Sequence, residues 1–447
     1  MAAATRVALG GLHSEIGKLN TAERLVRQGI SEMETLLAKG TNSAHLRPRE
    51  SLKLSHASAL SQLGRILMAR CQYGEAIECS ERCTVICRAV PKDACIILSG
   101  CTVDQVTTDA RSWLPSALHA AGRPAHAVDA AQQNLLHAIS CGAPVDTLLE
   151  ALLNHVSGLK ALFVHSAEKT APPARLAAML ADAYTCVARS RKVVDESVTL
   201  SPPQRAMWSM QIFFQTGQLA SLRGNVEQEQ SAFTSGLDTK LVDLASSDAD
   251  GRRITASLHA ALGSLFLTRK NPPQLDRAAI HLHEALQRYE REDGPHSRAL
   301  VPIFGDLALC CAMTADADCS FLYAQRWAKL SEQCYGADSS CTVEARKKLT
   351  EILRLRAEDG LPATVDPSLL PAAVSTQCDR CSVRSGGTVR LSKCARCGRA
   401  HYCSKPCQSA DWDRHRKTCT PALAAPISAA STPSPAAPIP VDKHWLD

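Results

Sequence analysis

Eight potential zinc-binding side chains lie within 42 residues of one another in the C-terminal part of the sequence. They follow the order Cys-x2-Cys-x12-Cys-x2-Cys-x5-Cys-x3-Cys-x7-His-x3-Cys. Eight ligands make two complete tetrahedral sets, and zinc prefers this mixture of thiolate and imidazole donors. We therefore predict two structural Zn²⁺ ions. The predicted ligands are Cys378, Cys381, Cys394, Cys397, Cys403, Cys407, His415 and Cys419.

The spacing of these ligands favours pairs that face one ion. Each Cys-x2-Cys pair suits a tight knuckle, in which both sulfur atoms point the same way. His415 and Cys419 are four residues apart on a predicted helix over 409–419, so their side chains leave the same face. Cys403 and Cys407 have the same spacing, and the serine and proline between them favour a helix start. Spacing alone permits either sequential or interleaved ligand sets.

Metal is needed because the segment has little else to bury. Its large apolar side chains are too few for an independent hydrophobic core. A structural zinc ion contributes an apparent free energy of roughly 10 to 16 kcal/mol in model fingers, which can replace the missing burial. We therefore expect folding of this segment to depend on metal. The large apolar side chains are Val383, Val389, Leu391, Tyr402 and Trp412.

The segment 378–419 resembles the MYND zinc finger in its ligands and in the residues between them. The resemblance implies interleaved ion sites. His401 is the local alternative to His415 as a ligand, but it lacks the four-residue spacing to Cys419, and we expect it to be a surface residue. The shared framework is Tyr402-Cys403-Ser404, Cys407-Gln408, Asp411-Trp412, His415 and Cys419. The first ion would take Cys378, Cys381, Cys403 and Cys407, and the second would take Cys394, Cys397, His415 and Cys419.

MYND fingers bind proteins, commonly short proline-containing peptides, and the resemblance implies the same function here. The peptide groove would be formed by the second knuckle and the helix that follows it. Its expected contact residues are Tyr402, Gln408 and Trp412.

Catalytic and nucleic-acid functions fit the segment less well. A catalytic zinc keeps one position open for water, whereas eight ligands for two ions leave none. MYND fingers also occur in SET-type lysine methyltransferases, but the chain has no counterpart of the SET motifs, and we expect no enzyme activity. The finger carries ten Lys and Arg against three Asp, yet they are scattered and few aromatic rings accompany them. A SET-less remnant, a cryptic methyltransferase-type enzyme and a nucleic-acid-binding finger remain alternatives.

Residues 1–358, which precede the finger, show helical periodicity throughout. Hydrophobic residues make up 45% of the chain and aromatic residues only 4%, which suits closely packed helices. The first clear helix has Asn20 and Glu23 in a capping-box relation and ends at Gly40.

Five units in this region resemble the tetratricopeptide repeat (TPR). In the best one, Gly64, Ala76 and Cys83 are small where two antiparallel helices must approach each other. The third unit departs from the pattern, because Glu229 stands where a small residue is expected. We predict a mostly α, TPR-like solenoid, since one hairpin cannot bury its own apolar face. An irregular helical bundle is the alternative. The units span 61–91, 117–138, 215–237, 260–290 and 303–336.

Other cysteines and histidines in the helical region have simpler interpretations. Cys79, Cys83 and Cys87 form a row on one helix, and we interpret them as small core residues because free cysteine packs as a hydrophobe. His281 and His283 are two residues apart, so they point to different faces and do not form a metal-binding pair.

The remaining segments complete the expected organisation. Residues 359–377 are predicted to be a Pro-rich linker, and residues 420–447 a disordered Pro/Ala/Ser tail. No signal sequence or membrane span is expected, and the many cysteines favour an intracellular protein of the cytoplasm or nucleus. We expect an adaptor, with the repeats as scaffold for one protein and the finger holding another. The sequence leaves the oligomeric state open.

Overall fold

A computed structural model describes residues 2–15, 18–39, 46–96, 99–362, 364, 380, 392–394 and 401–416. The chain divides into two compact units, Met1–Leu370 and Pro371–Asp447, which are described separately. Half of the predicted zinc ligands, most of the predicted linker and the whole predicted tail lie outside the described residues.

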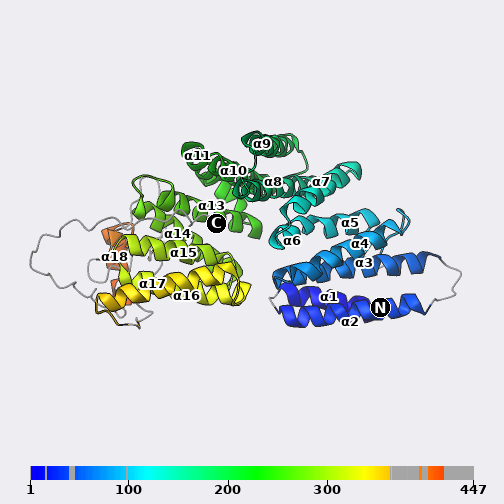
Figure 1. Cartoon of the computed structure of the whole chain (residues 1–447), viewed down its shortest axis with the longest axis horizontal. Coiled ribbons are helices and arrows are strands. Elements are labelled where there is room, and N and C mark those ends of the chain that lie inside the picture. The colour runs from blue at the N-terminus through cyan, green and yellow to red at the C-terminus, as the bar shows by residue number, and fades with distance from the viewer. Residues whose placement is uncertain are drawn as a thin grey trace, which may run out of the picture. The chain divides into compact units, whose positions relative to one another are not determined.

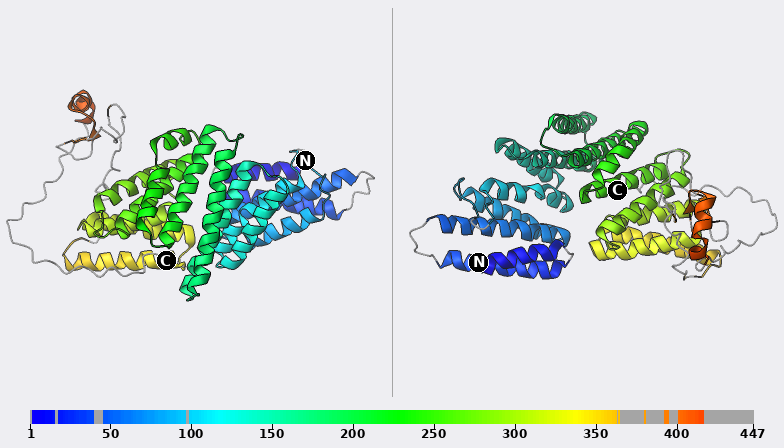
Figure 2. Two further views of the ribbon diagram at one scale, coloured as in Figure 1. Left: turned by 90° about the horizontal axis from the view of Figure 1, so that it is seen from above. Right: turned by 180° about the vertical axis from the view of Figure 1, so that it is seen from behind.

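The first unit is built from helical hairpins that stack in chain order (Figures 1 and 2). Its N-terminal half comprises α1 (Ala2–Glu15), α2 (Leu19–Ala38), α3 (Leu46–Ala69), α4 (Tyr73–Arg88), α5 (Val103–Ser112), α6 (Leu114–Ala120), α7 (Pro124–Ser140), α8 (Val145–Glu168) and α9 (Pro173–Glu196). Its C-terminal half comprises α10 (Pro202–Leu222), α11 (Val226–Gly236), α12 (Thr239–Ala245), α13 (Ala249–Thr268), α14 (Leu275–Asp293), α15 (Leu300–Met313), α16 (Ala317–Tyr335) and α17 (Ser340–Glu358).

This arrangement confirms the predicted TPR-like fold. The five units that resemble repeats coincide with the hairpins α3/α4, α6/α7, α10/α11, α13/α14 and α15/α16. Two further hairpins, α1/α2 and α8/α9, were not identified from the sequence. Each hairpin packs on the next, and the core therefore continues from one pair of helices to the following pair.

Glycines allow the close helix packing that the repeat pattern predicts. A Cβ atom at Gly217 would lie 2.3 Å from the ring of Phe233, which comes from the second helix of the same hairpin. At Gly64 the space is filled by Trp113, which comes from the next repeat. The small residue therefore serves packing within a hairpin in one case and between repeats in the other.

Two details differ from the sequence-based expectations. Asn20 lies inside α2, and Lys18 occupies the N-cap position without a side-chain cap. The capping-box prediction was wrong, because the carbonyl of Lys18 already accepts the first helical hydrogen bond from the backbone N–H of Ala22, and the helix therefore starts two residues earlier. Glu229 is buried at 5% exposure, and its Oε2 lies 3.8 Å from Nε of Arg269.

Helix α8 is the one described helix that is long and apolar enough to cross a membrane by length and composition. Its residues Leu149, Leu153 and Val156 are buried in a hydrophobic cluster with residues of α9 and α10. The interior of the repeat array therefore accounts for its apolar composition.

The interpretation of the isolated cysteines and histidines agrees with the packing. Cys79, Cys83 and Cys87 are all buried in the core of the N-terminal repeats. His281 faces His259, with their Nδ1 atoms 2.9 Å apart, whereas His283 bonds to Tyr323.

In the second unit, the described residues form a short hairpin and a helix. Strand β1 (Ser392–Lys393) pairs antiparallel with β2 (His401–Tyr402), and α18 (Lys405–His415) follows at once.

Candidate metal centre

Four of the eight predicted zinc ligands belong to the described residues. Cys394 follows β1, Cys403 follows β2, Cys407 lies in the first turn of α18, and His415 is the last residue of that helix. The other four, Cys378, Cys381, Cys397 and Cys419, lie outside the described residues.

Cys403 and Cys407 lie side by side at the start of α18. Ser404 is the N-cap residue, and its Oγ accepts a hydrogen bond from the backbone N–H of Cys407 at 3.4 Å. This cap turns the chain from strand into helix and brings the two thiols together. Their sulfur atoms are 3.5 Å apart. The helix begins at Lys405, where the serine and proline were expected to favour a helix start, and it continues into the segment predicted as helical from residue 409.

The separation of these sulfur atoms fits a zinc ion. Two thiolates bound tetrahedrally at the usual Zn–S distance of about 2.3 Å would have sulfur atoms about 3.8 Å apart. The observed 3.5 Å is close to that value. Within the described part of the finger no three potential ligands gather at one point. The predicted interleaved arrangement is compatible with this, because it assigns only two of the described ligands to each ion.

Cys394 and His415 are the described members of the predicted second ligand set. Both are buried, with exposures of 2% and 7%. The pairing of Lys393 with His401 places Cys394 directly beyond the end of the two-stranded ladder. His415 packs its ring edge-on against Tyr402, with ring centroids 6.1 Å apart.

A polar network around the buried carboxylate of Asp411 supports this packing. The Tyr402 hydroxyl donates to Oδ2 of Asp411 at 2.9 Å, and the Arg414 guanidinium donates to both carboxylate oxygens at 2.7 and 2.8 Å. These hydrogen bonds, with that from Arg414 the strongest, lower the pKa of Asp411. The network was not predicted as a site feature, although Asp411 stands in the MYND framework.

The three expected peptide-contact residues have different environments. Tyr402 is only 2% exposed, so its ring belongs to the interior of the finger. Trp412 is 37% exposed, and Gln408, one helical turn earlier on α18, is half-buried. The accessible part of the expected groove is therefore the face of α18 that carries Gln408 and Trp412.

The solved structures that match this chain have low similarity scores. The crystal structure of BtubC from P. vanneervenii has a TM-score of 0.35 and 12% identity, covering 63% of this chain and 99% of that chain. The Rap protein complexed with competence and sporulation factor has a TM-score of 0.34 and 10% identity, covering 80% and 98%. The fold assignment therefore depends on the helix packing described above.

Sequence comparison identifies the finger. The MYND finger family model matches residues 378–419. The N-lysine methyltransferases SMYD2 of Homo sapiens and Sus scrofa are each 46% identical over 44 residues. That match spans about a tenth of this chain and a tenth of each relative. Residues 378–419 are thus a MYND finger, a zinc finger of the protein-interaction type, and the chain before it is an array of TPR-like helical hairpins.

Proposed function

We propose that this chain is an adaptor that links two protein partners. The finger would hold a short proline-containing peptide, and the helical repeats would hold a second protein. Joining two weak sites in one chain raises the total affinity through the effective concentration of the second site. We propose no enzymatic role and a location in the cytoplasm or nucleus.

The observation that carries the proposal is the exposed Trp412 on a helix whose other face is fixed by the finger. Asp411 and His415, which share one face of α18, are both buried, and the Trp412 ring lies beside that of His415 with ring centroids 6.0 Å apart. This buried face anchors the helix in the finger, while the tryptophan remains accessible. Exposed aromatic side chains on a rigid support are frequent anchors of protein interfaces, and a proline ring packs well against an indole face.

Two zinc ions would hold the finger in this geometry. The described ligands Cys403 and Cys407 would contribute to the first ion, and Cys394 and His415 to the second. A closed set of four protein ligands supplies folding energy and leaves no position for substrate, so the role we propose for zinc is structural.

A peptide-binding measurement tests the proposal. The full-length, zinc-loaded chain is titrated into a fluorescein-labelled Pro-x-Leu-x-Pro peptide, and fluorescence polarisation is measured. We expect saturable binding and a loss of at least about tenfold in Trp412→Ala, because truncating a central tryptophan typically costs 2 kcal/mol or more. Val198→Ala removes an exposed apolar side chain in the repeat region and should bind normally. Equal affinity of Trp412→Ala and the unmodified chain would refute the peptide site.

The non-enzymatic role has its own test. Thermal-shift measurements with S-adenosylmethionine should leave the melting temperature unchanged. A saturable rise in melting temperature would favour a methyltransferase-type enzyme.

A further inference from the structure

The two ends of the helical array touch each other. The thiol of Cys71, in the turn between α3 and α4, donates to the carbonyl oxygen of Cys334 in α16 at 3.1 Å. The guanidinium of Arg298, in the loop before α15, lies 3.9 Å from the same sulfur atom. Segments more than two hundred residues apart in the chain therefore lie side by side, where the ends of α1–α3 face those of α15 and α16 in Figure 1.

A groove runs along this contact. Its larger part is a cavity of about 720 Å³, between the start of α2, the end of α3 and the end of α16. A smaller cavity of about 220 Å³ continues it past the loop before α15 and along α16. The two cavities share His296 and Gln333. We call them together the basic groove.

The charged side chains that line the basic groove are mostly cationic. Among the described residues, Glu290 is the one carboxylate in its lining. Arg70 is paired with Glu23, so its charge is largely compensated. The other cations keep the groove positive. The lysines and arginines of the lining are Lys18, Arg70, Arg298, Arg326 and Lys329.

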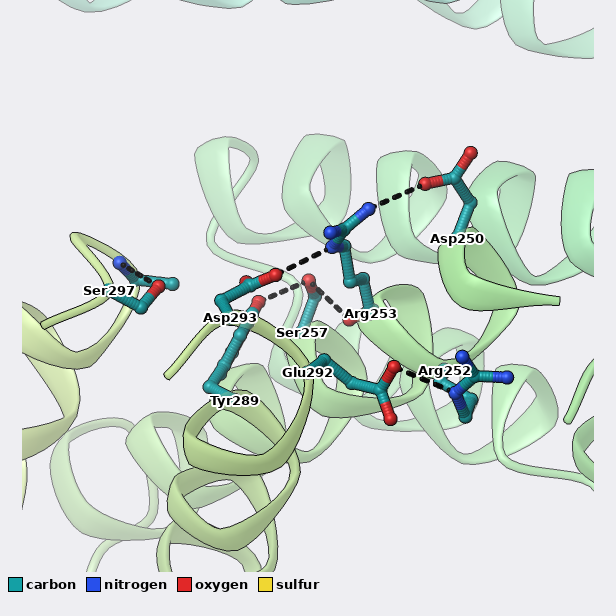
Figure 3. Close-up of polar contacts among 9 residues, drawn as sticks. Asp250, Arg252, Arg253, Ser257, Tyr289, Glu292, Asp293 and Ser297 are labelled. Carbon is teal, nitrogen blue, oxygen red and sulfur yellow. Dashed lines mark hydrogen bonds and ion pairs between the residues drawn. The ribbon is translucent and has the colours of Figure 1, made fainter. Parts of the chain in front are cut away.

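Two nearby carboxylates at the end of α14 already form ion pairs with arginines of α13. Figure 3 shows Glu292 paired with Arg252, and Asp293 paired with Arg253, each at 2.8 Å. These ion pairs hold the end of α14, from which the loop carrying Arg298 departs. The two carboxylates therefore hold the end of α14 against α13, and their charges are neutralised by their own arginine partners.

We infer that the basic groove binds an extended acidic segment of a partner protein. The inference rests on the proposed function, because it names the class of partner that the repeat array would hold. Side-chain carboxylates of such a segment would accept hydrogen bonds from Arg298 and Lys329. The amides of Asn20 and Gln333, which also line the groove, can bond to its backbone.

The lining favours an acidic peptide over a nucleic acid. Binding of single strands depends on aromatic faces on which bases stack. Phe304 lines the smaller cavity, but it is only 3% exposed and Arg326 lies over its ring at 5.8 Å. The described part of the groove therefore offers charge and amide groups, which match carboxylates and a peptide backbone.

A charge-reversal experiment tests the inference. The probe is a short fluorescein-labelled peptide of alternating Glu and Gly residues, titrated with the full-length, zinc-loaded chain. The double variant Arg298→Glu with Lys329→Glu should bind it at least about tenfold more weakly, since each change replaces attraction by repulsion. The matched control is Lys192→Glu with Lys240→Glu, which makes the same change of net charge at exposed sites on α9 and α12. The control should bind like the unmodified chain.

The other outcomes are equally decisive. No binding at low salt, or an equal loss in the groove and control variants, would overturn the inference. Tighter binding of a single-stranded DNA of similar length, lost in the groove variant, would assign the site to nucleic acid instead. Circular dichroism checks whether each variant is folded. If the charge-reversal variant is unfolded, the double variant Arg298→Gln with Lys329→Gln replaces it in the binding measurement.

The proposals for the groove and for the finger can be tested separately. The variant Cys403→Ser with Cys407→Ser should lose the proline peptide and keep the acidic one. The reverse is expected of the groove variant. Failure of the proline peptide alone would refute the finger's proposed function and leave the basic groove intact.

Discussion

The Tyr402 hydroxyl donates a hydrogen bond to Asp411 at 2.9 Å and thereby joins β2 to α18. The tyrosine ring also packs against His415, one turn further along the same helix. A predicted zinc ligand therefore packs against Tyr402, which is itself bonded to Asp411, and neither of these two residues belongs to the predicted ligand set. Such supporting contacts orient metal ligands and influence metal affinity.

Asp411→Ala should weaken zinc binding by the finger. The substitution leaves the buried Tyr402 hydroxyl without its acceptor, which costs about 1 to 3 kcal/mol. We expect zinc release at a lower chelator concentration, corresponding to an affinity loss of about tenfold. Competition of the full-length chain with a chromogenic chelator measures this. Ser409→Ala, at an exposed position of the same helix, is the control and should release zinc like the unmodified chain. Identical chelator profiles for Asp411→Ala and the control would contradict the supporting role.

Two glycine substitutions should have opposite effects on the stability of the repeats. Gly217→Ala places a methyl group 2.3 Å from the buried Phe233 ring, and overpacking of this kind costs about 1 to 3 kcal/mol. Gly74→Ala has no atom within 4 Å and should stabilise α4 by up to about 1 kcal/mol through helix propensity. Urea unfolding followed by circular dichroism compares them. Equal midpoints would mean that Gly217 is not a packing position.

The sequence was most informative where a residue type has few physical alternatives. The spacing of cysteine and histidine was enough to predict the finger, and small residues at repeat positions located five hairpins. The α8/α9 hairpin was missed because its two 24-residue helices do not follow the repeat pattern. Asp411 was assigned no role because only the fold reveals that it bonds to Tyr402.

Glu229 shows that a residue can depart from the repeat pattern while the helical hairpin still forms. It occupies a position where a small residue is expected, yet α10 and α11 still form a hairpin. Its carboxylate is buried, and burial raises the pKa of this group, while the charge of Arg269 opposes the shift. The repeat position thus tolerates a large side chain because Arg269, at the end of α13, lies nearby. A local sequence pattern does not predict this contact.

Arg356 should be important for the C-terminal end of the repeat array. It is 2% exposed and donates to the carbonyl of Ala317 at 3.0 Å, to Asp318 at 2.8 Å and to the carbonyl of Pro362 at 2.9 Å. Arg356→Ala should lower the free energy of unfolding by about 2 kcal/mol or more, since several charge-assisted hydrogen bonds are lost. Urea unfolding measures the loss.

Arg354 provides the control for this substitution. It lies on the same helix, is 62% exposed and pairs only with exposed Glu358 among the ion pairs of the described residues. Arg354→Ala should cost no more than about 0.5 kcal/mol, because exposed ion pairs contribute little. A similar loss in both variants would show that burial of Arg356 does not matter.

The repeat array should lose stability as the pH falls below neutrality. Burial lowers the pKa of His281 from its ordinary 6.5 to about 4, and the charge of Arg277 adds to the shift, while that of Glu284 opposes it. Burial, together with the charges of His281 and Arg288, also holds the pKa of His259 well below 6.5. The unfolded chain therefore binds protons more readily than the folded one. The stability due to neutral His281 is complete above pH 6.5 and is lost towards pH 4.

The contribution of His281 to this pH dependence can be measured with one substitution. His281→Gln should reduce the fall in unfolding free energy between pH 6.5 and 4 by up to about 3 kcal/mol, whereas His126→Gln, at an exposed position, should not. Urea unfolding over this pH range gives the comparison. Parallel stability curves for the two variants would contradict the assignment.

Zinc content tests the central claim most directly. Native mass spectrometry of the full-length chain should find two Zn²⁺ per molecule, and the variant Cys403→Ser with Cys407→Ser should retain one. Removal of both ions by a chelator should unfold the finger and abolish binding of the proline peptide, while the helical content of the repeats remains. A chain without bound zinc, or one that keeps its peptide affinity after complete zinc removal, would contradict the account.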